Sequence, residues 1–152
     1  MNTSGIVSEA LAIQKIISEE LSAKSVMPEK IHRILKSLVD SLKADGALLY
    51  ATVDENYLEL MGRYNVDEYK NNIRYEEGII GSSASSKIVR FSTDSAKNIS
   101  EICIPITRLH ITIGVIVLLK HNADGYDDAK VEEIETLCLP LVDLVSSRMF
   151  ED

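Results

Sequence analysis

The chain has 152 residues, of which 45% are hydrophobic and 26% are charged, and its formal net charge is −8. This length fits one domain with a sizeable core, and the composition is that of a soluble globular protein rather than a disordered chain. Nucleic-acid binding requires a basic face for phosphate contacts, whereas the lysines and arginines here are scattered singly among acidic residues. We therefore expect no nucleic-acid partner.

The sequence gives no sign of a membrane or secretory segment. Charged residues such as Glu9 and Lys15 interrupt the apolar residues near the N-terminus, unlike a signal peptide. No apolar run is long enough to cross a bilayer. Cys103 and Cys138 each lie inside an apolar run, which favours core packing and a reducing compartment over a disulfide. We expect a cytoplasmic protein with no membrane partner.

Two amphipathic helices are predicted at the N-terminal end. Apolar residues recur at spacings of three and four over residues 6–24, and again from Pro28 to about Ala44. Pro28 separates the two stripes and is tolerated in the first turn of a helix. We assign residues 1–27 to an N-terminal helix used in packing or dimerisation, and residues 28–152 to the sensory or binding domain proper.

The periodicity after Asp45-Gly46 is that of strands. Two strand-like runs on either side of Asp54–Asn56 predict a hairpin, and the segment from Glu77 to Ala84 predicts a short helix whose small residues pack closely on a sheet. The strands are predicted over residues 47–53, 57–64, 73–75, 87–91, 102–106 and 111–120.

A single long helix is predicted at the C-terminal end. Asp127 is a suitable N-cap, and Tyr126 with Val131 would form a hydrophobic staple. Pro140 lies inside the helical stripe and predicts a kink, because proline removes one backbone hydrogen bond.

These elements predict an α+β domain. The expected architecture is a central antiparallel sheet with the terminal helices packed on one face, and the short helix with its loops over the other. The run from Ile111 to Leu119 is almost entirely apolar, so we expect a central strand covered on both faces.

Five short segments occur in the order and spacing of a known family. They are Ala44–Tyr50, Glu77–Gly81, Ile104–Ile106, Gly114–Leu118 and Tyr126–Asp128. Across roughly residues 28–148 the chain resembles a GAF domain, the small-molecule sensing fold of phosphodiesterases, sensor kinases and transcriptional regulators. Within that family it is most similar to the N-terminal sensory domain of the nitrogen-type phosphoenolpyruvate–protein phosphotransferase.

The resemblance implies a regulatory domain that binds a small polar metabolite, either an amino acid or a nitrogen-status signal. The regulated phosphotransferase would lie outside this chain, and no cofactor is implied. The chain lacks the residue clusters of cyclic-nucleotide-binding and bilin-binding members.

A second interpretation is a GAF scaffold without a ligand, which serves dimerisation and signal relay in a phosphotransferase or sensor histidine kinase. It rests on Ser92–Glu101, which is short where many members have a long loop over the pocket. In either case the first and last helices are expected to form a homodimer.

No catalytic or metal site is expected. His32, His110 and His121 lie on separate predicted elements without the spacing of metal ligands. Some GAF proteins reduce free methionine sulfoxide with cysteines near the pocket, which leaves this activity as a minor alternative. It requires exposed, activated thiolates, whereas Cys103 and Cys138 are expected in the core.

A ligand pocket is expected between the exposed sheet face and the short helix. The candidate lining residues are Tyr50, Tyr75, Ile79, Ser82, Ser83, Arg90 and Ile104. Arg90 is included because a guanidinium can hold a carboxylate with two hydrogen bonds. The alternative roles are close packing and capping for the serines, and a surface position for Arg90.

Overall fold

The computed structural model describes residues 12, 15, 16, 19, 27–54, 56–94, 96–121 and 128–149. The four separate residues near the N-terminus are helical, while the rest of the helix predicted over residues 6–24 lies outside the described residues. The predicted N-cap Asp127 and the staple residue Tyr126 also lie outside them. Within the described part, no helix has both the length and the apolar character needed to cross a membrane.

Six strands of the described chain form one antiparallel sheet in the order β3-β2-β1-β6-β5-β4. The strands are β1 (Gly46–Val53), β2 (Tyr57–Tyr64), β3 (Asn72–Arg74), β4 (Arg90–Asp94), β5 (Ile99–Arg108) and β6 (Ile111–Lys120). β1 and β6 occupy the centre, and seven of the ten β6 positions, Thr112 to Leu118 in sequence, are buried. The predicted central strand is therefore confirmed.

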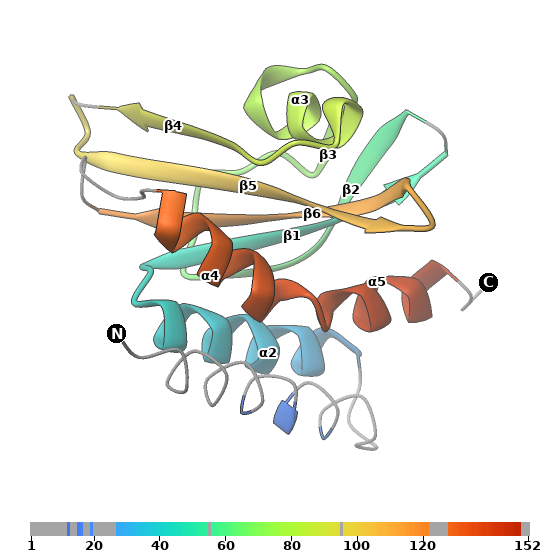
Figure 1. Cartoon of the computed structure of the whole chain (residues 1–152), viewed down its shortest axis with the longest axis horizontal. Coiled ribbons are helices and arrows are strands. Elements are labelled where there is room, and N and C mark those ends of the chain that lie inside the picture. The colour runs from blue at the N-terminus through green and yellow to red at the C-terminus, as the bar shows by residue number, and fades with distance from the viewer. Residues whose placement is uncertain are drawn as a thin grey trace.

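The helices form one layer on each side of the sheet (Figure 1). α2 (Met27–Leu42), α4 (Asp128–Cys138) and α5 (Leu141–Met149) cover one face, and α3 (Gly78–Ser86) lies over the other. The α+β architecture predicted from the sequence is confirmed.

Strand alternation divides the apolar residues into two cores. Leu49, Ile102 and Ile116 pack against α2, α4 and α5, while Tyr50, Cys103 and Val117 pack on the side of α3. Successive side chains of a strand point to opposite faces, so neighbouring residues contribute to different layers. We call these the helix side and the α3 side.

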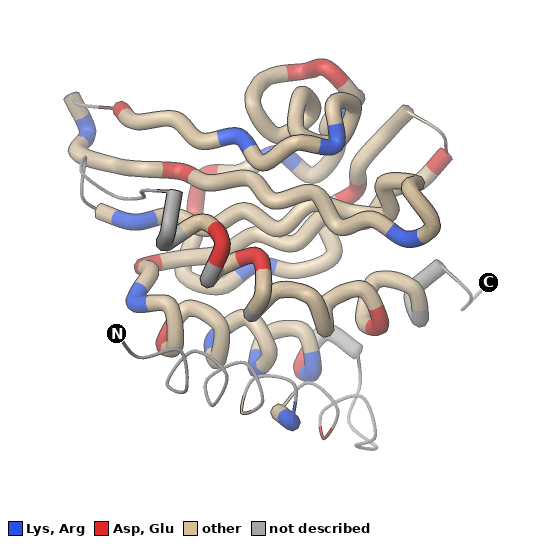
Figure 2. The backbone as a smooth tube through the Cα atoms, in the orientation of Figure 1, with Lys and Arg blue, Asp and Glu red and all other residues tan. Residues whose placement is uncertain are grey.

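Charged residues are interspersed over the elements. Figure 2 shows lysine and arginine positions separated along the chain, with aspartate and glutamate between them. This distribution agrees with the scattered charges of the sequence.

Three predicted elements differ from the structure. The strand predicted over residues 102–106 is longer at both ends and spans Ile99–Arg108. The strand predicted over residues 87–91 begins only at Arg90 and continues to Asp94, because Lys87 adopts a left-handed φ of 60° that caps α3. The backbone N–H of Lys87 donates to the carbonyl of Ser83 at 3.0 Å and so ends the helix.

The C-terminal helix is broken rather than kinked. α4 ends at Cys138 and α5 begins at Leu141, with Pro140 between them. The N–H of Leu139 donates to the carbonyl of Thr136 at 3.4 Å, and the N–H of Asp143 donates to that of Pro140 at 3.2 Å. These three-residue turns replace the α-helical ladder that proline interrupts.

α3 packs very closely against the end of β3. A Cβ atom at Gly81 would overlap the carbonyl oxygen of Arg74 and lie 3.0 Å from the backbone nitrogen of Glu76. Both neighbours are backbone atoms, so they cannot move aside as a flexible side chain could. Glycine at this position lets the helix lie on the sheet.

Gly81→Val is expected to lower the free energy of unfolding by about 1–3 kcal/mol, because the added side chain forces α3 away from β3. Urea unfolding measures the change. Ser82→Ala on the same helix is the matched control, with an expected change within about 0.5 kcal/mol. Equal stability of the two variants would contradict the close packing of α3.

Candidate ligand pocket

Two adjoining cavities lie on the α3 side of the sheet. The first has a volume of about 560 Å³ and extends between the β4–β5 hairpin and residues 65–68. The second, of about 470 Å³, continues toward the start of α3. Glu68, Glu101 and Leu119 line both cavities, so we treat them as one sheet pocket. Each volume falls within the range of small-molecule sites.

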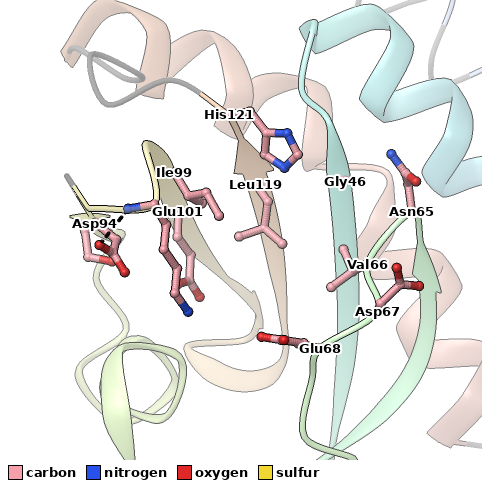
Figure 3. Close-up of a pocket in the computed structure, with 12 residues that line it drawn as sticks. Gly46, Asn65, Val66, Asp67, Glu68, Asp94, Ile99, Glu101, Leu119 and His121 are labelled. Atoms are coloured by element: carbon pink, nitrogen blue, oxygen red, sulfur yellow. Dashed lines mark hydrogen bonds between the residues drawn. The ribbon is translucent and has the colours of Figure 1, made fainter.

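The first cavity is enclosed from two sides (Figure 3). Asp94, Ile99 and Glu101 line it from the β4–β5 hairpin, and Asn65 to Glu68 line it from the opposite side. Leu119 lies between these two groups. The pocket thus has an apolar floor with polar groups around it.

The start of the segment after β2 is fixed by Arg63. Its Nη1 donates to the carbonyl of Val66 at 2.7 Å and lies 4.0 Å from Asp67 Oδ1. The guanidinium also stacks over the ring of Tyr69, 4.8 Å from its centroid. One side chain therefore holds three residues of the pocket wall.

The end of the same segment is fixed from the sheet and from α3. The hydroxyl of Tyr50 donates to the carbonyl of Lys70 at 2.7 Å. Lys70 Nζ lies 3.0 Å from Glu77 Oε2, which connects the segment to the residue preceding α3. Residues 65–71 therefore form a wall with contacts at both ends, which we call the 65–71 wall.

Glu101 is the carboxylate that lies deepest between the two cavities. Burial raises its pKa, because a desolvated carboxylate loses the hydration of its charge. The thiol of Cys103 donates to its Oε1 at 3.8 Å, which is a weak hydrogen bond. Burial, with the negative charge of Glu101 as the next cause, raises the pKa of Tyr50 to about 12.

Carboxylates outnumber cationic side chains in the pocket. Asp67, Glu68, Asp94, Glu77 and Glu101 line it, against Lys70 and Lys97. Such a site favours a ligand that brings a positive charge or a hydrogen-bond donor to Glu101.

Solved structures with the same fold are numerous. The GAF domain of an Acinetobacter phosphoenolpyruvate–protein phosphotransferase superposes with a TM-score of 0.74 at 15% identity, covering 92% of this chain and 93% of that one. The GAF domain of the corresponding Coxiella burnetii enzyme gives a TM-score of 0.73 at 18% identity, with 93% of each chain covered.

The chain has the fold of a GAF domain. A type II free methionine-R-sulfoxide reductase from Thermoplasma acidophilum also shares it, with a TM-score of 0.69 and 14% identity over 80% of this chain and 93% of that one. No family model matches the sequence, and no curated protein sequence matches it significantly.

On this GAF fold, the sequence-predicted lining residues do not all come together. Tyr50 and Ile79 both line the second cavity of the sheet pocket. Tyr75 instead lines a separate cavity of about 320 Å³ beyond α3. Its hydroxyl lies 3.0 Å from Thr52 Oγ1 and 3.3 Å from the carbonyl of Thr112.

The two candidate serines serve α3 itself. The buried hydroxyl of Ser83 is placed to donate to the carbonyl of Ile88 at 2.9 Å and to that of Cys103 at 3.2 Å. The Ser82 carbonyl accepts hydrogen bonds from the hydroxyls of Ser85 and Ser86 at 3.3 and 2.7 Å. The Ser83 hydroxyl therefore joins α3 to β5, and neither serine is among the residues that line the sheet pocket.

Arg90 and Ile104 lie away from the sheet pocket. Arg90 is exposed at the start of β4, and Ile104 packs on the helix side, opposite the pocket. Ile104 is therefore separated from Tyr50 by the sheet, because adjacent strand residues alternate between faces.

Most residues of the pocket wall were not predicted from the sequence. Glu68 and Lys70 lie in a polar segment without periodicity, and Glu101 was treated only as the end of a loop. One sequence signal could have identified Glu101. It lies two residues before Cys103 on the same strand, and residues two apart on a strand point to the same face.

The cysteines lie in different cores. Cys138 is buried on the helix side and Cys103 on the α3 side, and both thiols are free. Burial raises the pKa of Cys138 to about 12 and raises that of Cys103 further, so neither thiol ionises readily. Among the residues that the structure describes, no cluster of His, Cys, Asp and Glu could hold a metal ion.

Tyr50→Phe is expected to loosen the 65–71 wall, because it removes the hydrogen bond to Lys70 and leaves the buried ring in place. We expect a loss of about 1 kcal/mol in unfolding free energy and faster amide exchange in residues 66–71. Tyr57→Phe on the exposed part of β2 is the control and should leave exchange in the wall unchanged. Unchanged exchange in Tyr50→Phe would refute the anchoring role of this hydroxyl.

Proposed function

We propose that this chain is a regulatory GAF-type sensory domain that binds a small polar metabolite in the sheet pocket. The metabolite is an amino acid or another nitrogen-status signal, and the regulated output is a phosphotransferase domain outside the chain. The observation that carries the proposal is the pair of adjoining cavities, which share the half-buried Glu101 at their junction. The free, buried thiols support a reducing cytoplasm as the setting.

The pocket charges support a ligand with a protonated amine. A cation beside Glu101 would offset the desolvation that raises the pKa of this carboxyl. A ligand with two carboxylates would instead add negative charge next to Glu68 and Glu101. The proposed ligand class is therefore an amino acid such as glutamine, in preference to 2-oxoglutarate.

The sheet offers a route from the pocket to the terminal helices. β5 presents Glu101 and Cys103 on the α3 side, and Ile102 and Ile104 on the helix side. α5 contacts both β5 and β6. If β5 has two positions and the ligand binds one of them more tightly, binding favours the packing of α5 that goes with that position. Such a difference in affinity between two conformations is what regulation by a ligand requires.

Calorimetric titration tests the ligand class. We expect glutamine to bind and 2-oxoglutarate to bind at least about ten-fold more weakly, with Glu101→Gln weakening glutamine about ten-fold through the lost charged hydrogen bond. Glutamine binding should also weaken as the pH falls through the raised pKa of Glu101, because protonation removes the acceptor charge. Glu132→Gln on the exposed surface of α4 is the matched control.

The outcomes separate the two parts of this proposal. Tighter binding of 2-oxoglutarate would contradict the amine preference and leave the sensory function standing. Silence toward an entire panel of amino acids and organic acids would contradict the sensory function itself.

The alternative function is a GAF scaffold that dimerises and relays a signal without a ligand, in a phosphotransferase or sensor histidine kinase. It is supported by the short hairpin between β4 and β5, which covers the sheet pocket less than a long loop would. Both functions include a homodimer through the first and last helices.

Light scattering across a concentration series tests this homodimer. We expect a dimer mass at high micromolar concentration, because the apolar stripe predicted over residues 6–24 would be buried between two copies. A monomer mass at that concentration would be evidence against signal relay through paired helices. Dimerisation without any ligand response would favour the scaffold.

We propose no enzymatic role for this chain, and in particular no methionine sulfoxide reduction. A disulfide between Cys103 and Cys138 would have to cross the sheet, since the two residues pack in cores on opposite faces. Their raised pKa values also oppose formation of the attacking thiolate.

A further inference from the structure

β4 is an edge strand whose outer side pairs with no strand in the described part of the chain. It is the last strand in the sheet order, and all five of its residues are exposed. Phe91 has 55% of its surface exposed. An edge strand presents unpaired backbone N–H and C=O groups, and this one contains neither proline nor lysine to oppose pairing.

The residues of β4 are complementary to themselves. In an antiparallel pair of two β4 strands, a two-fold axis at Ser92 places Arg90 of each copy opposite Asp94 of the other. Phe91 then lies opposite Thr93. This is the register in which all five residues of each strand are paired, and it gives two oppositely charged cross-strand pairs. Registers centred on Phe91 or Thr93 pair only three residues of each strand and leave Arg90 without Asp94.

The carboxylate of Asp94 is already oriented in the single chain. Its Oδ1 accepts hydrogen bonds from the backbone N–H groups of Ala96 and Lys97 at 3.1 and 3.2 Å. Both bonds use the same oxygen, so Oδ2 can accept from a guanidinium of a second copy.

We propose that β4 is an interface for a second copy of this chain, which extends the sheet across a two-fold axis at Ser92. Ser92 and Asp94 line the sheet pocket, and strand alternation places Arg90 on the same face. Pairing therefore brings Arg90 of the second copy to the rim of the first copy's pocket, beside Asp94. Each pocket gains a cation at an edge rich in carboxylates.

This interface stands on the geometry of β4 and does not depend on the proposed ligand. It is also distinct from pairing of the terminal helices, which lie on other elements of the domain. The two contacts can coexist, so the test must report on β4 itself.

Cross-linking through an introduced cysteine provides that test. Residues directly opposite each other in an antiparallel pair have Cα atoms about 4.5–5.5 Å apart, which is within the range of a disulfide. Ser92→Cys in the full chain should therefore form a covalent dimer under mild oxidation, seen by non-reducing electrophoresis. The native Cys103 and Cys138 are buried, so the wild-type chain should not cross-link.

Thr93→Cys is the matched control, because its side chain is exposed on the same strand but faces Phe91 of the second copy. The two introduced cysteines would then be diagonal neighbours about 7–8 Å apart, at the limit for a disulfide. We expect Ser92→Cys to cross-link at least about ten-fold faster than Thr93→Cys. Equal rates for the two variants would overturn the proposed register.

Reversing the charge of Arg90 tests the proposed ion pair between Arg90 of one copy and Asp94 of the other. Arg90→Asp, combined with Ser92→Cys, should slow cross-linking about ten-fold because two attractive pairs become repulsive. Arg108→Asp, which changes an exposed arginine at the far end of β5, should leave the rate unchanged when combined in the same way. A rate for Arg90→Asp equal to that for Arg108→Asp would overturn the contact between Arg90 and Asp94.

Discussion

The antiparallel pairing of β1 with β6 determines both layers of this domain. Leu49 lies opposite Ile116 on the helix side, and Leu48 lies opposite Val117 on the α3 side. A slip of one residue would move every one of these side chains to the other face. The apolar run of β6 is compatible with this position because both of its faces are covered. The same pair supplies Leu119 to the floor of the sheet pocket.

Strands with strong local signals were predicted closely. The predicted bounds of β6 and β2 agree with the structure, because a turn flanks each apolar or alternating run. The start of β4 was missed, since the left-handed cap at Lys87 belongs to the preceding helix and has no strand periodicity. Pro140 identified the interruption of the last helix, but the separation into α4 and α5 depends on turns that the helical stripe does not reveal.

The pocket was harder to predict from the sequence than the fold. Tyr50 and Ile79 were identified because the pocket was expected between the sheet and the short helix, and these residues lie on β1 and α3. Cys103 and Ile104 are neighbouring apolar residues on a strand buried on both faces, so the pattern does not show which one points toward α3. Glu68 and Glu101 come together only through the pairing order of the sheet, which brings distant segments to one place.

The break at Pro140 divides the C-terminal part of the domain into two separate helices, α4 and α5. Both helices pack in the helix-side core, and no continuous α-helical ladder joins them. The angle between α4 and α5 can therefore change without breaking an α-helical ladder between them. Any such change of angle is concentrated at Leu139 and Pro140, the two residues that separate the helices.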